Sequence, residues 1–319
     1  MACEYDRPKG ASIPSLADYP RGPADLKCPF GGRYANCGDI PNRQGLVSII
    51  TVTFNSIKTL GRTIDSVATQ SYHNIEYIVV DGGSTDGTVD LLRNRSGDID
   101  LWISERDRGI SDAFNKGIAL ARGDFVLLVN SDDWIEPHHV KTAVAALEES
   151  NAQFVFGNLA VHTPAGVVDY LVIGDSEYER CIRHSMPDIN HPSVVCRREV
   201  YERCGLYDCS LGVAMDYEWL LRCYASGVRG KYVDALTSHM LGTGVSNWDF
   251  GRSIAEVRVI STKYGYPKAA ASARYVVRFV KLGIRKFIER RISARLAQRM
   301  RAMLHKRIRL VEFDDHGLR

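Results

Sequence analysis

The chain has 319 residues, a formal net charge of +3, 45% hydrophobic residues and 25% charged residues, which are ordinary values for a globular domain with additions or for two domains. No run of about 18 apolar residues occurs, which excludes a membrane-spanning helix. Neither a secretory signal nor a Cys-x-x-Cys zinc pair is visible. We therefore expect reduced cysteines and a cytoplasmic location.

The first 45 residues are rich in Pro, Gly and Asp and show no hydrophobic period. Such a composition lacks the regular apolar face that a helix or a strand buries. We therefore expect residues 1–45 to form an N-terminal extension that is partly disordered.

Short apolar runs alternate with stretches of helical spacing between residues 46 and 134. Runs of β-branched residues predict buried strands, and apolar residues at steps of three and four predict helices. Alternation of the two is typical of βαβ units, so we predict an α/β fold with a mainly parallel sheet. The predicted strands are 46–53, 75–80, 99–104 and 125–129, and the predicted helices are 57–70, 88–95 and 111–121.

Acidic residues follow two of these strands. Asp81 ends the second strand, and Asp132 and Asp133 come shortly after the fourth. Ligands of open α/β sheets bind at the carboxyl ends of the strands, and carboxylates there suit a divalent cation bridged to phosphate. The sequence therefore predicts a metal and nucleotide-diphosphate site. The alternatives are a plain turn at Asp81 and a pair of solvated acids that cap the helix opened by Glu136-Pro137.

The second half of the chain mixes strands and helices less regularly. Apolar periodicity predicts helices over 138–150 and 201–208 and another that begins near Asp216. We predict strands over 154–158 and 233–238, with a hairpin over 158–180 between them. On this evidence Asp216 is either a functional acid or an acid stabilised by the dipole of its helix.

Four ordered segments resemble the motifs of inverting glycosyltransferases of family 2, which have the GT-A fold. These segments are 47–55, 78–88, 105–117 and 130–133, and weaker similarity continues to residue 246. The resemblance implies a GT-A domain over 46–250, with a nucleotide-sugar half at 46–134 and an acceptor half at 135–250. It also implies a mainly parallel nucleotide-binding sheet flanked by helices.

The resemblance also implies roles for individual residues of the nucleotide-sugar half. Asp133 is expected to bind Mn²⁺ or Mg²⁺ at the diphosphate, and Asp132 to lie near the ribose and the metal. The family often has an acid where this chain has Asn130, so the metal site depends on these two carboxylates. The expected nucleotide-sugar-binding residues are Thr53, Phe54, Asn55, Asp81, Asp107, Lys116 and Asp132.

The acceptor half contains the expected catalytic base. Asp216 matches the family's base, although Met215 replaces the usual Glu before it, and Glu218 is the competing candidate. His191, before Pro192, resembles a segment near the acceptor, with a purely structural histidine as the alternative. His239 begins a segment that resembles a loop after the sheet, from which it is expected to reach the diphosphate or the metal.

The last part of the chain, 251–319, is predicted to be a basic helical region. Between residues 268 and 310 fourteen Lys and Arg residues stand against the single acid Glu289, with apolar residues at helical steps. We expect this amphipathic tail to bind an anionic membrane surface, because each cation near such a surface adds about 1 kcal/mol. A solvated helix packed on the body is the alternative, and we expect no nucleic acid.

Together these features predict a metal-dependent inverting glycosyltransferase. Its donor would be a UDP-, GDP- or dTDP-sugar and its acceptor a lipid-linked or saccharide hydroxyl, in polysaccharide or glycolipid assembly at the inner face of the plasma membrane. The alternative is a non-catalytic membrane-surface protein with a degenerate GT-A fold. A nucleotidyltransferase or a dehydrogenase fits less well, because no Gly-rich phosphate loop follows the first strand.

Overall fold

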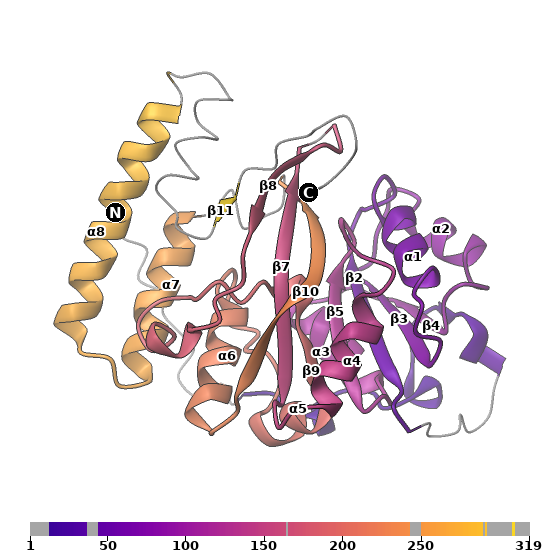
Figure 1. The fold of residues 1–319 in the computed structure, drawn as a ribbon. Helices are drawn as coiled ribbons and strands as arrows, with labels where there is room; N and C mark the ends of the chain where they lie inside the picture. The colour runs from indigo at the N-terminus through magenta and orange to yellow at the C-terminus, as the bar shows by residue number, and fades with distance from the viewer. Residues whose placement is uncertain are drawn as a thin grey trace.

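A computed structural model describes residues 13–36, 44–163, 165–242, 250–289, 291 and 308–309. One mixed sheet crosses the molecule, with strand order β1-β4-β3-β2-β5-β9-β7-β10-β6, while β8 pairs with β7 and β11 with β8 (Figure 1). The strands are β1 Phe30–Gly31, β2 Val47–Thr53, β3 Ile75–Asp81, β4 Leu101–Ser104, β5 Phe125–Asn130, β6 Asp133–Ile135, β7 Phe154–His162, β8 Val168–Val172, β9 Val195–Arg197, β10 Gly230–Leu241 and β11 Ile308–Arg309.

Helices cover both faces of this sheet. They are α1 Leu60–Ala68, α2 Thr88–Asn94, α3 Ile110–Leu120, α4 His139–Glu148, α5 Arg198–Cys204, α6 Met215–Ala225, α7 Phe250–Lys263 and α8 Lys268–Glu289. The alternating strands and helices predicted over 46–134 are therefore confirmed, with their ends shifted by up to three residues. The helix predicted over 201–208 begins earlier, at Arg198, and ends at Cys204.

Residues 46–134, the expected nucleotide-sugar half, contain the parallel part of the sheet. β2 pairs in parallel with β3 on one side and β5 on the other, and every residue of β2 is buried. Alternate side chains enter two hydrophobic clusters, because successive residues of a strand point to opposite faces. One cluster joins Ile50 and Ile78 to α3, and the other joins Ile49 and Val79 to α1, α2 and α4.

Residues 135–250, the expected acceptor half, contain the mixed part of the sheet. β9 pairs antiparallel with both β5 and β7, and β10 runs parallel to β7. β7 and β8 form the hairpin that the sequence predicted. β10 is longer than the predicted strand and continues to Leu241, so His239 lies inside a strand and not in a loop after the sheet. Residues 243–246 of that expected loop lie outside the described residues.

Part of the N-terminal segment is packed on the body, which the sequence did not predict. β1 pairs antiparallel with β4, and Arg33 forms an ion pair of 2.6 Å with Asp100. Tyr19 is buried, and its hydroxyl donates a 3.0 Å hydrogen bond to Asp112 of α3. Residues 1–12 and 37–43 lie outside the described part of the chain.

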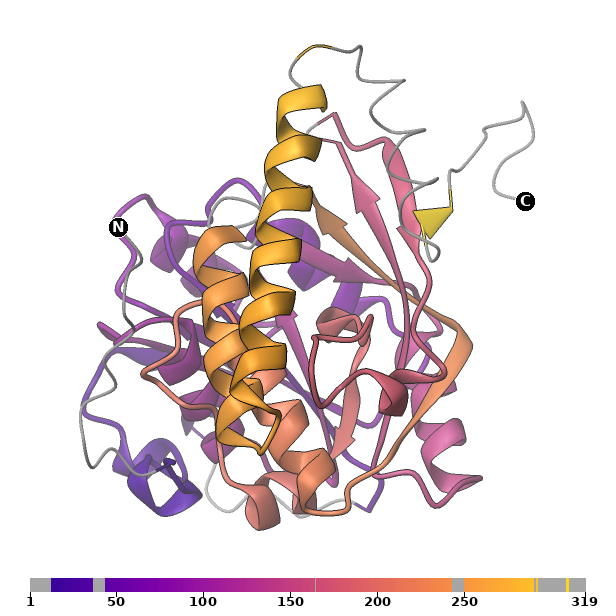
Figure 2. The same ribbon diagram turned by 90° about the vertical axis from the view of Figure 1, so that its left-hand side faces the viewer.

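Two helices follow the sheet at its acceptor end. α7 and α8 lie side by side, and α8 extends beyond the end of α7 in both views (Figures 1 and 2). The helix predicted in the basic tail is thus confirmed as far as Glu289, and most of 290–310 lies outside the described residues. Among the described residues, no helix combines the length and the apolar character that a bilayer crossing requires.

Candidate active site

Several of the predicted nucleotide-sugar residues lie at or just after the carboxyl ends of neighbouring strands, whereas Lys116 lies within α3. Thr53 at the end of β2 pairs with Asp81 at the end of β3, and Val52 pairs with Asn130 at the end of β5. Parallel strands place such residues at one edge of the sheet. The fold therefore brings together groups that are up to 80 residues apart in sequence.

The Asp81 carboxylate organises the loop that follows β3. It is fully buried and accepts hydrogen bonds from the backbone N–H groups of Gly83 at 3.1 Å and Ser84 at 3.0 Å. It also accepts hydrogen bonds from the hydroxyls of Ser84 and, at 2.7 Å, Ser104. Asp81 thereby fixes the conformation of this loop at the end of the strand.

Phe54 and Asp107 form the accessible part of this edge. Phe54 is 62% exposed, although aromatic side chains are usually buried. A side chain at Gly82 would collide with the Asp107 carboxylate and contact the Phe54 ring, so the absence of a Cβ lets both approach the loop. This exposed ring beside a carboxylate is suited to one face of a nucleoside.

Asn55 and Lys116 play supporting roles in the structure. Asn55 has a φ of 51°, a region that Asn tolerates better than most residues, and its side-chain oxygen accepts the Thr85 N–H at 2.9 Å. Lys116 is nearly buried in α3 and forms an ion pair of 2.7 Å with Glu105. Both residues fix loops around the site, and their polar groups are already engaged.

The two acids after β5 differ in accessibility. Asp133 is fully buried in β6, and its Oδ2 accepts a 2.8 Å hydrogen bond from the side chain of Asn130. Burial and the neighbouring Asp132 raise the pKa of Asp133 well above its usual value. Asp132 is partly exposed, and burial raises its pKa as well, while Arg62 acts in the opposite direction. Asp132 is therefore the carboxylate of this pair that a solvent-borne ligand can reach.

Three buried oxygen atoms of the described residues, one of them from Asp133 itself, lack a hydrogen-bond partner. These atoms are Asp133 Oδ1, Asn130 Oδ1 and Thr53 Oγ1. Oxygen ligands are those that Mg²⁺ and Mn²⁺ prefer, and Mg²⁺ is often held by one or two carboxylates plus substrate phosphates. Within the described residues no group of three or more His, Cys, Asp or Glu side chains is placed to hold a metal. The donor set fits a cation whose remaining ligands come from a diphosphate.

The expectation that His239 reaches the diphosphate or the metal stays a prediction, and strand pairing places His239 and Asp133 on opposite faces of the sheet. Met240 of β10 pairs with Asp133 of β6, and His239 pairs with Trp134. The His239 ring stacks on Trp134, and its nitrogens lie 2.6 Å from Glu136 Oε1 and 2.9 Å from His162 Nε2. Burial is the main effect that lowers its pKa.

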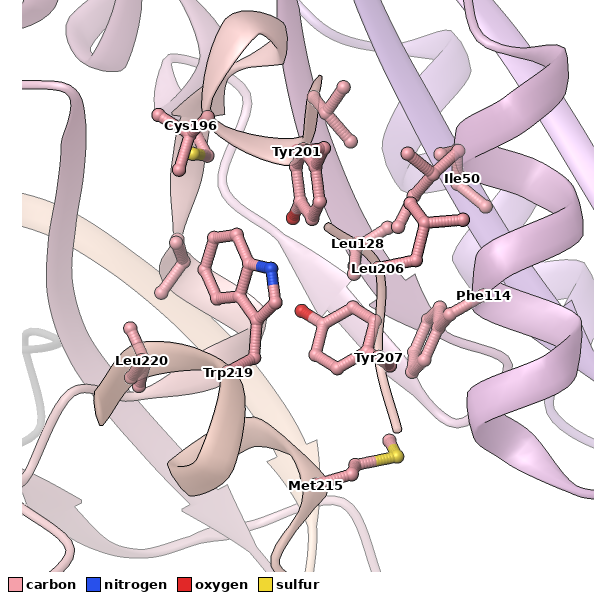
Figure 3. Close-up of a cluster of buried hydrophobic side chains, with 14 of the residues drawn as sticks. Ile50, Phe114, Leu128, Cys196, Tyr201, Leu206, Tyr207, Met215, Trp219 and Leu220 are labelled. Carbon is pink, nitrogen blue, oxygen red and sulfur yellow. The ribbon is translucent and has the colours of Figure 1, made fainter. Parts of the chain in front are cut away.

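Asp216 and His191 line one small cavity in the acceptor half. Leu128, Val194, Tyr201, Tyr207, Trp219 and Leu220 complete its lining. The Tyr207 hydroxyl lies 3.3 Å from His191 Nε2, and the Tyr207 ring packs between Phe114 and Trp219 (Figure 3). Burial lowers the pKa of His191 to about 4, so this histidine is neutral at pH 7.

Asp216 is the carboxylate among the residues that line this cavity. It lies in the first turn of α6, and its burial raises its pKa to about 6. The competing candidate Glu218 is fully occupied, because it binds Arg222 at 3.0 Å, Tyr264 at 2.7 Å and Lys263 at 3.5 Å. No ion pair engages Asp216 within the described part of the chain.

Reasoning from the sequence missed two residues of this region. Tyr207 lies in an extended segment after α5, where no motif marks it, and Glu256 of α7 binds the segment before Asp216. Both contacts depend on packing between distant segments, so no local pattern predicts them.

Comparisons with known proteins identify relatives of this chain. The model of the family described as Glycosyl transferase family 2 matches residues 48–205. The chain is 34% identical over 138 residues to glycosyltransferase GlyA of Streptococcus pneumoniae, covering 42% of this chain but only 20% of that protein. It is 34% identical over 179 residues to an uncharacterized glycosyltransferase of Mycobacterium tuberculosis, covering 55% of this chain and 68% of the relative.

Solved structures share the fold at low sequence identity. The S. aureus TarS structure of residues 1–349 in complex with UDP-GlcNAc has a TM-score of 0.53 at 20% identity, covering 70% of this chain and 69% of that one. The mannosyltransferase PcManGT from Pyrobaculum calidifontis, in complex with GDP-Man and Mn²⁺, also has a TM-score of 0.53 at 16% identity, covering 84% and 83%. With its parallel sheet, its strand-end acids and these relatives, the chain belongs to glycosyltransferase family 2 and has the GT-A fold.

Proposed function

We propose that this protein is an inverting glycosyltransferase in which Asp216 is the catalytic base. The observation that carries this proposal is the placement of Asp216, which lines the small cavity, is only partly exposed and forms no ion pair with a described cation. Desolvation raises its pKa to about 6. Such a carboxylate is ionised at pH 7 and still basic enough to accept a proton. As an acceptor hydroxyl attacks the anomeric carbon, its proton passes to Asp216. A single displacement inverts that carbon without an enzyme nucleophile.

We propose that a divalent cation, Mn²⁺ or Mg²⁺, is bound beside Asp132. This assignment differs from the expectation that Asp133 binds the metal, because Asp133 is fully buried and accepts a hydrogen bond from Asn130, while Asp132 is partly exposed. When bound, the cation stabilises the negative charge of the departing nucleoside diphosphate. Asp133 supports the turn that carries Asp132.

The donor is a nucleotide sugar, and its base is proposed to stack on the exposed ring of Phe54, beside Asp107. Solved structures of the same fold contain UDP-GlcNAc and GDP-Man, which supports a UDP- or GDP-sugar, and a dTDP-sugar is the third candidate. We propose a lipid-linked or saccharide hydroxyl as the acceptor. A relative from Mycobacterium bovis that is 26% identical is named PGL/p-HBAD biosynthesis glycosyltransferase, which supports a setting in glycolipid or polysaccharide assembly.

We further propose that α8 holds the enzyme on the cytoplasmic face of an anionic membrane. Apolar residues that are more than half exposed recur at steps of three and four along it, namely Val276, Phe279, Val280, Ile284 and Phe287. Arg274, Arg278 and Lys281 are exposed on the opposite side of the helix. Such a helix lies in the headgroup region with its apolar face inward.

A donor screen tests the enzyme proposal. The purified chain is incubated with Mn²⁺ or Mg²⁺ and a panel of UDP-, GDP- and dTDP-sugars, and nucleoside diphosphate release and thermal stability are measured. We expect metal-dependent stabilisation and slow hydrolysis with one donor. If no donor were hydrolysed or raised the thermal stability, with or without metal, the result would favour a non-catalytic protein that keeps a degenerate GT-A fold.

A further inference from the structure

A buried carboxylate from α7 binds the segment that leads into α6. Glu256 is only 1% exposed, and it accepts hydrogen bonds from three successive backbone N–H groups. Its Oε1 accepts the N–H of Gly212 at 3.1 Å, and its Oε2 accepts those of Val213 at 3.0 Å and Ala214 at 2.7 Å. Three converging backbone donors form an anion-binding nest, and here a side chain of the same protein occupies it.

Arg252 completes this contact from the preceding turn of α7. Its Nε donates a 2.9 Å hydrogen bond to Glu256 Oε1 and balances the buried charge. A side chain at Gly212 would collide with the Arg252 guanidinium, so the glycine leaves room for this ion pair. A buried carboxylate is costly unless it is paired and hydrogen-bonded, and both conditions are met.

The segment held by Glu256 ends at the catalytic base. Ala214 is the residue before α6, its carbonyl accepts the N–H of Glu218 at 3.1 Å, and Asp216 follows two residues later in the first turn. The direction in which Asp216 points is therefore set by the path of residues 212–214. That path is fixed by α7, which lies outside the region matched by the family model, residues 48–205.

We infer that Glu256 is the positioning residue for Asp216, an inference that rests on the proposed function. The family's usual acid before the base is absent, because Met215 stands there and its sulfur accepts a hydrogen bond from the buried Ser111 hydroxyl. Glu256, which follows Asp216 by 40 residues, instead holds the backbone segment that leads to the base.

The charge of Glu256 also acts on Asp216. After burial, the negative charge of Glu256 contributes to the raised pKa of Asp216, and the backbone N–H of Tyr217 opposes both. The other titratable groups that line the cavity of Asp216 are His191, Tyr201 and Tyr207. Burial lowers the pKa of His191 to about 4 and raises the pKa of both tyrosines, so these three are neutral at pH 7.

The test compares the pKa of Asp216 in three full-length variants and the wild type. The side-chain carboxyl carbon of Asp216 is followed by NMR against pH without any donor, with Asp216→Asn used to assign the signal. Glu256→Gln removes the nearby negative charge and is expected to lower the pKa of Asp216. Arg252→Gln removes the balancing positive charge and is expected to raise it. Glu149→Gln, an exposed glutamate at the end of α4, is the matched control and is expected to change nothing.

Turnover is measured on the same variants with UDP-GlcNAc and GDP-mannose. For Glu256→Gln we expect kcat to fall about 100-fold with an unchanged KM for the donor, because a small misplacement of a reacting group has an effect of that size. The acidic limb of its kcat profile moves to lower pH. If the pKa of Asp216 in Glu256→Gln and in Arg252→Gln equalled that in the wild type, the inference would be overturned, even if Glu256→Gln were less stable. If the wild type turned over neither UDP-GlcNAc nor GDP-mannose, that result would count against the proposed function instead. The inference on Glu256 would still be tested, because the NMR measurement needs no turnover.

Discussion

The side-chain amide of Asn130 donates a 2.8 Å hydrogen bond to Asp133 Oδ2, and this bond holds Asp133 inside the protein while its neighbour Asp132 is partly exposed. An acid at position 130 would add a third negative charge, whereas the neutral amide of Asn130 supplies a hydrogen-bond donor. Asn130 thereby separates the two adjacent carboxylates into a buried support and an accessible ligand.

Replacing Asp132 and Asp133 one at a time tests whether Asp132 is the cation ligand and Asp133 the buried support. Asp132→Ala is expected to abolish the thermal stabilisation that a nucleotide sugar gives in the presence of Mn²⁺, because the accessible cation ligand is lost. Asp133→Asn preserves shape and is expected to weaken that stabilisation much less. Isothermal titration with donor, with and without Mn²⁺, measures the difference. If Asp133→Asn were the more damaging change, Asp133 would be the metal ligand.

Removal of the proposed base affects chemistry and not donor binding. Asp216→Asn is expected to lower kcat by about 10²–10⁴-fold, the range that general base catalysis contributes, with little change in the donor KM. Initial rates of nucleoside diphosphate release in the presence of acceptor measure this. Glu218→Gln is the informative comparison, because a larger catalytic loss there without unfolding would move the base to Glu218.

The pH dependence of both activity and stability follows from Asp216. Its pKa is raised to about 6, so kcat is expected to rise with pH up to about 6 and then level off as the base becomes ionised. The folded state binds this proton more tightly than the unfolded state, so the contribution of Asp216 to stability is present at low pH and is lost as pH rises through about 6.

The same linkage gives a thermal prediction. Asp216→Asn is expected to raise the Tm at pH 7.5, because it removes a partly desolvated charge, and to have less effect at pH 4.5, where the wild-type carboxyl is protonated. Calorimetry at the two pH values measures the change. An equal shift at both would mean that Asp216 is not desolvated.

The exposed ring of Phe54 is expected to contribute to donor binding. Phe54→Ala is predicted to raise the donor KM about 2- to 10-fold with kcat unchanged, since an aromatic stack is worth about 0.5–1.5 kcal/mol in ground and transition states alike. Val167→Ala, an exposed apolar residue between β7 and β8, serves as a control. A fall in kcat instead of a rise in KM would exclude simple stacking.

The amphipathic face of α8 is tested with vesicles. The double variant Phe279→Ser and Phe287→Ser is expected to lose most of its co-sedimentation with phosphatidylglycerol vesicles, while Val167→Ser keeps it. Wild-type binding should fall as salt rises, because the cationic side adds a screened attraction. Equal binding to phosphatidylcholine vesicles would contradict a role for the cations, and undiminished binding of the double variant would exclude this face.

By itself, the sequence determined the parallel half of the fold and the edge at which its site lies. Hydrophobic period and strand–helix alternation are local properties, so β2, β3, β5 and the acids Asp81, Asp132 and Asp133 were placed correctly. The resemblance to the family then selected Asp216 over Glu218, and this choice stays a prediction. In the structure Glu218 binds Arg222, Lys263 and Tyr264.

Only the tertiary structure decided which polar groups are accessible. Whether a carboxylate is buried depends on segments packed against it, so adjacent Asp132 and Asp133 have different environments that no spacing reveals. His239 lies in β10 on the face opposite Asp133 because strand pairing fixes the register. Glu256 reaches the base segment because α7 folds back on α6, and that contact depends on packing and not on local sequence.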